Sequence, residues 1–114
     1  MDVGFRTDKG RRRFNNEDAF FVMKNDRVFV VADGVGGNNS GEIASRTATK
    51  QIADFVKEND IDGMDPVDFL LKAIEQANAK VYDLSKKYKE NNGMATTTVI
   101  AYLKDSWLYI LNVG

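Results

Sequence analysis

The residues best suited to chemistry lie in two short stretches of the first third of the chain. Residues 11–18 read RRRFNNED, in which Arg13 stands four residues before the adjacent acids Glu17 and Asp18. Residues 27–37 read RVFVVADGVGG, an apolar run that ends in Asp33 and a glycine-rich turn. Hard divalent cations prefer carboxylate and carbonyl oxygens, and arginine suits phosphate esters. Together the stretches predict phosphate chemistry that uses metal ions.

The composition excludes several other kinds of chemistry. The 114 residues include no cysteine and no histidine, which excludes disulfide scaffolds, thiolate nucleophiles, cysteine-based zinc sites and Ser-His-Asp triads. A formal charge of −1 argues against general binding to nucleic acid or to anionic membranes. Because no apolar stretch approaches the ~20 residues needed to span a membrane, we expect a soluble, cytoplasmic protein.

Two β-hairpins are predicted, one near each end of the chain. Residues 20–24 and 27–32 are rich in β-branched and aromatic side chains, and Asn25-Asp26 between them favours a two-residue turn. Residues 97–103 and 107–111 form the second pair, joined through residues 104–106. Residues 3–6 could add a short opening strand.

Two helices are predicted between the hairpins. One runs from Ser40 to about Glu58, and the other begins with Asp65 as N-cap and Pro66 as its first helical residue. Apolar residues at spacings of three and four predict the buried stripes, which are Ile43, Ala44, Ala48, Ile52, Phe55 and Val56, then Phe69, Leu70, Ala73, Ile74, Ala77, Val81, Leu84 and Tyr88. The order of elements predicts one α+β domain with helices packed on antiparallel sheet.

The first hairpin should bring the two acidic stretches together. Glu17 and Asp18 precede its first strand and Asp33 ends its second, so both lie at the same end of the sheet. A two-residue turn at 25–26 places position 18 opposite position 33. Two carboxylates that close would repel each other unless a cation lay between them, so Asp18 and Asp33 could share a metal ion or its bound water. Arg13, five residues before Asp18, is within reach of the same end.

Simpler readings stay open for each of these residues. Asp33 with its glycines could form only an Asx-turn, because aspartates are common in turns, and Arg13 could be an ordinary surface side chain. The run from Gly34 to Asn39 nearly matches the dinucleotide fingerprint G-x-G-x-x-G but has Asn39 in the sixth position. The preceding strand also lies in a hairpin, which is the wrong context for that motif.

Four stretches together resemble the metal-dependent serine/threonine protein phosphatases of the PPM type (type two C), particularly the bacterial branch. They are TDKGRRRFNNEDAFFV at 7–22, FVVADGVGGNNSGEIAS at 29–45, GMATTTVIA at 93–101 and LNVG at 111–114. The resemblance implies a sandwich of two antiparallel sheets flanked by helices, with two or more Mn²⁺ or Mg²⁺ ions at one end. It implies that Asp33 bridges two ions and Gly34 offers its carbonyl to one. Glu17 and Asp18 would bind through metal-held waters, and Arg13 would hold the substrate phosphate.

The resemblance also implies phosphorylated protein substrates and an opposing serine/threonine kinase. Asn38 and Val35 stand where many family members carry histidine, so protonation of the leaving group would fall to water or another group. The family domain is roughly twice as long as this chain, against the usual domain range. We therefore expect residues 1–114 to be the N-terminal portion of a single phosphatase domain, inactive alone and inclined to self-association. A non-catalytic regulatory or binding domain on the same scaffold is the alternative.

Overall fold

A computed structural model describes residues 18–37, 39–88 and 93–114. The predicted strand at residues 3–6 lies outside this part of the chain. In order, the elements are β1 (Asp18–Met23), β2 (Val28–Val35), α1 (Ser40–Glu58), a short 3₁₀ helix (Ile61–Gly63), α2 (Pro66–Lys87), β3 (Ala95–Lys104) and β4 (Trp107–Val113).

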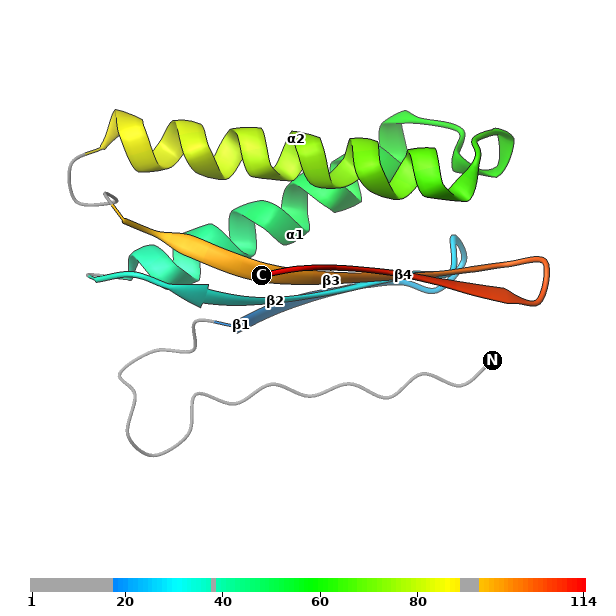
Figure 1. The fold of residues 1–114 in the computed structure, drawn as a ribbon, viewed down its shortest axis with the longest axis horizontal. Coiled ribbons are helices and arrows are strands. Elements are labelled where there is room, and N and C mark those ends of the chain that lie inside the picture. The colour runs from blue at the N-terminus through cyan, green and yellow to red at the C-terminus, as the bar shows by residue number, and fades with distance from the viewer. Residues whose placement is uncertain (1–17, 38, 89–92) are drawn as a thin grey trace.

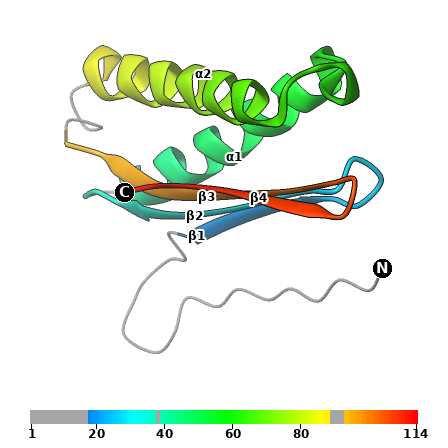
Figure 2. The ribbon, with the colours of Figure 1, turned by 45° about the vertical axis from the view of Figure 1, so that its right-hand side comes forward.

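The four strands form one antiparallel sheet in the order β1-β2-β3-β4. Both helices lie on the same side of this sheet, α1 next to it and α2 farther out (Figures 1 and 2). This arrangement confirms the predicted α+β class. Within the described residues nothing covers the other side of the sheet, where the expected sandwich would place a second one.

The first hairpin has the predicted turn and register. The amide of Arg27 donates to the carbonyl of Lys24 at 3.2 Å, which closes a turn centred on Asn25 and Asp26. Met23 is then the partner of Val28, and the pairing continues to Asp18 opposite Asp33. At the end of the hairpin that carries Asp18 and Asp33, both strands extend beyond the predicted ranges of 20–24 and 27–32.

The second hairpin turns through Asp105 and Ser106, which both have positive φ, 51° and 68°. Such a pair matches the twist of the flanking strands. Lys104 pairs with Trp107, so Lys104, predicted to lie in the loop, belongs to β3 instead.

Each helix begins where the sequence predicted. The carboxylate Oδ2 of Asp65 accepts hydrogen bonds from the amides of Val67 and Asp68 at 3.1 and 3.2 Å, so it satisfies two of the free amides in the first turn of α2. α1 starts at Ser40 after Asn39, whose φ of 68° is a left-handed conformation that asparagine tolerates. No helix among the described residues is both long and apolar enough to cross a membrane.

The hydrophobic core lies between the sheet and the helices. Its centre is an aromatic row in which Phe69 lies 5.9 Å from Phe55 and 5.1 Å from Tyr102, ring centre to ring centre. Two predicted core residues are wrong. Ile43 is 37% exposed because smaller residues of the first turn of α1 face the sheet, and Tyr88 is 43% exposed because α2 ends one residue before it.

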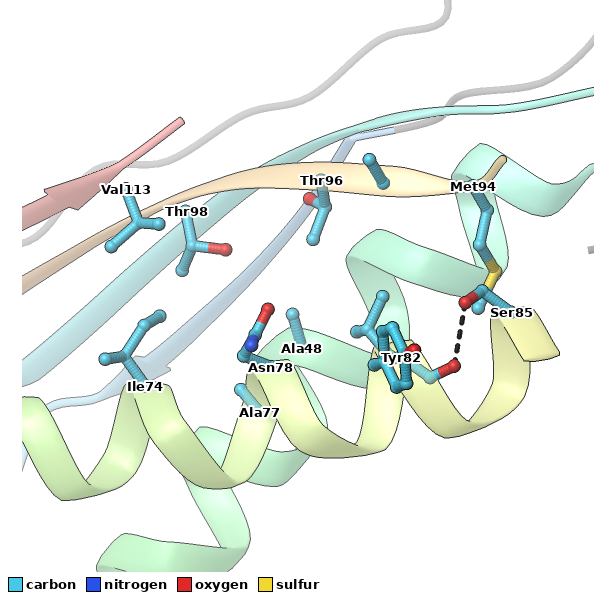
Figure 3. Close-up of a pocket in the computed structure, with 12 residues that line it drawn as sticks. Ala48, Ile74, Ala77, Asn78, Tyr82, Ser85, Met94, Thr96, Thr98 and Val113 are labelled. Atoms are coloured by element: carbon cyan, nitrogen blue, oxygen red, sulfur yellow. Dashed lines mark hydrogen bonds between the residues drawn. The ribbon is translucent and has the colours of Figure 1, made fainter. Parts of the chain in front are cut away.

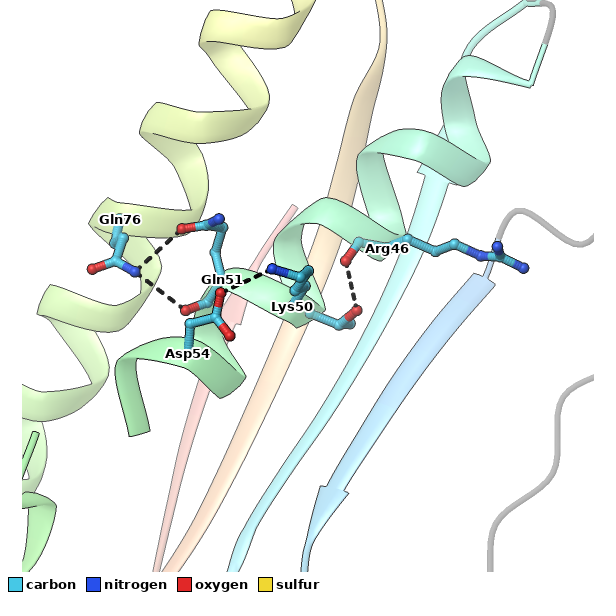
Figure 4. A network of polar contacts seen from close by, with 6 residues as sticks. Arg46, Lys50, Gln51, Asp54 and Gln76 are labelled. Carbon is cyan, nitrogen blue, oxygen red and sulfur yellow. Dashed lines mark hydrogen bonds and ion pairs between the residues drawn. The ribbon is translucent and has the colours of Figure 1, made fainter. Parts of the chain in front are cut away.

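A glutamine pair joins α1 to α2 through side-chain hydrogen bonds (Figure 4). The side-chain amide of Gln76 on α2 donates to the side-chain and backbone oxygens of Gln51 on α1, at 3.2 and 3.4 Å. Next to Gln51 in sequence, Lys50 forms an exposed ion pair with Asp54 at 3.2 Å. The glutamine contacts therefore join α1 to α2, whereas the ion pair lies within α1 alone.

Candidate metal centre

Asp18 and Asp33 are direct partners across the first two strands. Residues opposite each other in an antiparallel pair project from the same face of the sheet. In β2 the buried residues alternate with exposed ones, and Asp33 belongs to the exposed set that faces away from the helices. Asp18 is half-buried, and its Oδ1 atom is shielded from solvent. The predicted pairing of the two acids is therefore confirmed.

This pair fits a divalent cation in its donor chemistry. Like charges directly opposite each other on a sheet are destabilising, and a cation between two carboxylates offsets that repulsion. Oxygen donors are also the ligands that Mg²⁺ and Mn²⁺ accept. Among residues 18–37, 39–88 and 93–114, however, no three acidic, histidine or cysteine side chains come together as a metal-binding group. The described residues thus supply only part of a coordination shell.

The backbone at Asp33 is fixed by threonines of the neighbouring strand. The hydroxyl of Thr97 donates to the carbonyl oxygen of Asp33 at 3.4 Å. The hydroxyl of Thr96 shares its proton between the carbonyl oxygens of Thr97 at 2.8 Å and Asp33 at 3.1 Å. Gly34 follows directly, buried and paired with Thr96. Sequence reasoning did not assign this role to the threonines, since the pairing of β2 with β3 spans two helices and no hairpin turn sets it. The run of three threonines at 96–98 was the available signal.

A tight turn leads from the acidic strand end into α1. A Cβ atom on Gly36 would lie 2.8 Å from the Cβ of Ser40, too close for any larger residue without a backbone shift. The amide of Ser40 donates to the carbonyl of Gly37 at 2.9 Å. The glycines after Asp33 therefore bring the start of α1 against the end of β2.

α1 contributes a cation, also missed by sequence reasoning, to a surface hollow that Asp18 lines. Arg46 forms an ion pair with Glu42 at 2.7 Å, and its side chain reaches from α1 toward β1 (Figure 4). Arg46, Lys50 and Asp18 line one surface hollow of about 410 Å³. Helical spacing gave no reason to select Arg46, because its nearness to Asp18 depends on how α1 packs over β1.

Arg13 and Glu17, the other two predicted site residues, lie outside the described part of the chain. Their roles stay predictions, as do the metal-binding roles of Asp18, Asp33 and Gly34.

Comparison with known proteins agrees with this geometry. The sequence profile of the protein phosphatase 2C family matches residues 8–114. The chain belongs to that family. The serine/threonine phosphatase Stp of Listeria monocytogenes serotype 4b is 36% identical over 119 residues, which cover all of this chain and 47% of the relative. The chain thus spans about half the length of the curated relatives it matches.

Solved structures of 2C-type phosphatases share the fold. The Mycobacterium tuberculosis phosphatase PstP/Ppp superposes with a TM-score of 0.84 at 28% identity, over 96% of this chain and 45% of that one. A structure of the PstP catalytic domain in complex with two manganese ions gives the same TM-score and identity, over 96% of this chain and 46% of that one. A bacterial serine phosphatase bearing an R161E mutation gives 0.87 at 30% identity, over 100% of this chain and 53% of that one.

Proposed function

We propose that the protein acts in metal-dependent hydrolysis of phosphoserine and phosphothreonine in proteins. The observation that carries this proposal is the cross-strand pair of Asp18 and Asp33 on the face of the sheet that the helices leave open. Two further findings support it, namely the family membership and the manganese ions bound by the PstP relative.

Mn²⁺ or Mg²⁺ is the proposed cofactor, held by Asp33, Asp18, Glu17 and the carbonyl of Gly34. When bound, such ions neutralise phosphate charge and make water a better nucleophile. The hydroxyls of Thr96 and Thr97 position Asp33 through its carbonyl.

Arg13 is proposed to hold the substrate phosphate. A guanidinium offers two parallel donors to two phosphate oxygens, which fixes the orientation of the ester. Neither Val35 nor Asn38 can donate a proton in the way that a histidinium does, so the proton for the departing serine or threonine oxygen comes from water or from another group.

The proposal includes a place for this chain in a larger unit. Residues 1–114 form the N-terminal portion of a single phosphatase domain, and residues beyond them complete the metal shell and the second sheet. The substrates are phosphorylated proteins, and a serine/threonine kinase supplies them. Where the chain occurs alone, the apolar face of its sheet favours self-association.

The test uses two proteins, this chain alone and this chain fused to the part of the Listeria phosphatase that it does not match. Each is assayed with a phosphothreonine peptide and Mn²⁺, with and without Asp33→Asn. We expect the fusion to turn over the peptide only with metal and with Asp33 intact, and a loss of at least ~100-fold, about 3 kcal/mol in the barrier, in the variant. A fusion that is folded and binds Mn²⁺ but releases no phosphate would overturn the proposal.

A non-catalytic regulatory or binding domain is the second candidate. It is favoured by the absence, within the described ranges, of any group of three metal-ligating side chains. The same assay separates the two functions, since a regulatory domain predicts no phosphate release from the fusion, whereas a partial catalytic site predicts activity once the missing part is supplied.

A further inference from the structure

A cavity of about 170 Å³ lies between α2 and the first half of β3, on the helix-covered side of the sheet (Figure 3). Its floor is formed by Ala48 of α1 and Ala77 of α2, which are 2% and 1% exposed. Short side chains at these two positions leave the space open. Ile74, Val81 and Met94 supply apolar walls. The cavity lies on the opposite face of the sheet from the carboxylates of Asp18 and Asp33 and shares no residue with that pair.

The polar groups of the cavity are neutral and lie mainly on its β3 side. Asn78 projects from α2 toward β3, where Thr96 and Thr98 face it (Figure 3). Ser85 is already engaged, since its hydroxyl donates to the carbonyl of Tyr82 at 2.7 Å. None of the described residues that line the cavity carries a charge. A ligand that fits is therefore uncharged, largely apolar, and able to form one or two hydrogen bonds.

The volume limits the size of that ligand. An apolar cavity of ~150 Å³ in a protein accommodates benzene, so the space here suits one aromatic ring with a small substituent. Small-molecule sites commonly combine apolar walls with a few placed polar groups, as this cavity does.

We propose that this cavity binds a small neutral aromatic alcohol, and that the bound molecule influences the position of Asp33. The link is Thr96, which lines the cavity and whose one hydroxyl proton is shared between the carbonyl oxygens of Thr97 at 2.8 Å and Asp33 at 3.1 Å. A ligand hydroxyl that competes for Thr96 alters this contact and with it the backbone at Asp33. Binding of the aromatic alcohol does not depend on the proposed phosphatase function. Its effect on metal affinity does rest on that proposed function.

The probe is p-cresol, titrated into the ¹⁵N-labelled 114-residue chain without metal and followed by amide chemical shifts. We expect saturable shifts at residues that line the cavity and at Asp33. Ala77→Leu fills the cavity and should abolish them. Ala79→Leu is the matched control, because Ala79 lies two residues away on the same helix and is exposed. It should bind p-cresol as the unchanged chain does.

A second variant protects the test against misfolding of Ala77→Leu. Asn78 is exposed, so Asn78→Ala should fold normally and weaken p-cresol binding by about tenfold through loss of a hydrogen bond. Shifts that fail to saturate, or an affinity that neither folded variant changes, would overturn the binding site.

The link to Asp33 is tested separately by Mn²⁺ titration with and without saturating p-cresol. At least a threefold change in the Mn²⁺ dissociation constant, absent in Ala77→Leu, supports the link. An unchanged constant would refute it, and failure of Mn²⁺ to bind at all would refute the metal site while leaving the p-cresol result intact.

Discussion

The two faces of the sheet are built from the same strands but differ in solvent exposure and in the charge that they carry. On β3, Ile100 is fully buried under the helices, whereas its neighbour Val99 is 37% exposed on the other face. On β2, Val30 is 2% exposed and Val31 is 56% exposed. The covered face is closed by apolar packing, and the open face carries Asp18 and Asp33 amid exposed aliphatic side chains.

The difference agrees with the proposal that the metal site lies on the side of the sheet opposite the packed core. Apolar side chains fill the covered face except at the cavity between α2 and β3. The open face retains two carboxylates opposite each other, an arrangement that disfavours folding and whose repulsion the proposed metal ion would offset. Exposed apolar area of this kind also marks surfaces that take part in further association.

The largest expected difference in stability is between substitutions at two adjacent residues of β3, one on each face of the sheet. Ile100→Ala removes three buried carbons and should lower the free energy of unfolding by about 2–5 kcal/mol. Val99→Ala, its neighbour on the open face, should cost less than about 1 kcal/mol, because its side chain already contacts solvent. Urea denaturation of both variants measures the difference. Equal losses would show that the open face is packed as tightly as the covered one.

A smaller effect is expected where α2 is held over the covered face. Asp65→Ala removes the side chain that accepts from the amides of Val67 and Asp68, and should cost about 1 kcal/mol. Asp83→Ala, near the C-terminal end of the same helix and exposed, is the matched control and should change stability by less than half as much. If the two variants lose the same stability, the cap does not fix the start of α2.

The smallest effect concerns a polar group within the covered face. Burial and the nearby carboxylate of Asp62 raise the pKa of Tyr102 above its ordinary value of 10.0. The folded chain therefore holds this proton more tightly than the unfolded chain, so the contribution of Tyr102 to stability is complete below pH 10 and declines as the pH rises beyond it. Tyr102→Phe should flatten that decline, measured as the free energy of unfolding between pH 8.5 and 10.5. An unchanged slope would assign the decline to other groups.

Local features of the sequence predicted a large part of this fold. The turn at Asn25-Asp26 set the register that brings Asp18 opposite Asp33, and the sequence Asp65-Pro66 set the start of α2. Both depend on neighbouring residues alone. The roles of Thr96 and Arg46 were not predictable in this way, because they depend on the pairing of β2 with β3 and on the packing of α1 over β1. Contacts of that kind join segments that are distant in sequence, and neither periodicity nor capping encodes them.

The central claim is that Asp18 and Asp33 bind a divalent cation together. The most direct test is the loss of the free Mn²⁺ signal in electron paramagnetic resonance on titration with the 114-residue chain, compared among Asp33→Asn, Asp18→Asn and Asp26→Asn. Asp26, exposed at the opposite end of the same hairpin, is the matched control. We predict that each of the first two variants weakens Mn²⁺ binding by at least ~10-fold, about 1.4 kcal/mol, while Asp26→Asn leaves it unchanged. Equal affinity in all three variants would contradict the claim.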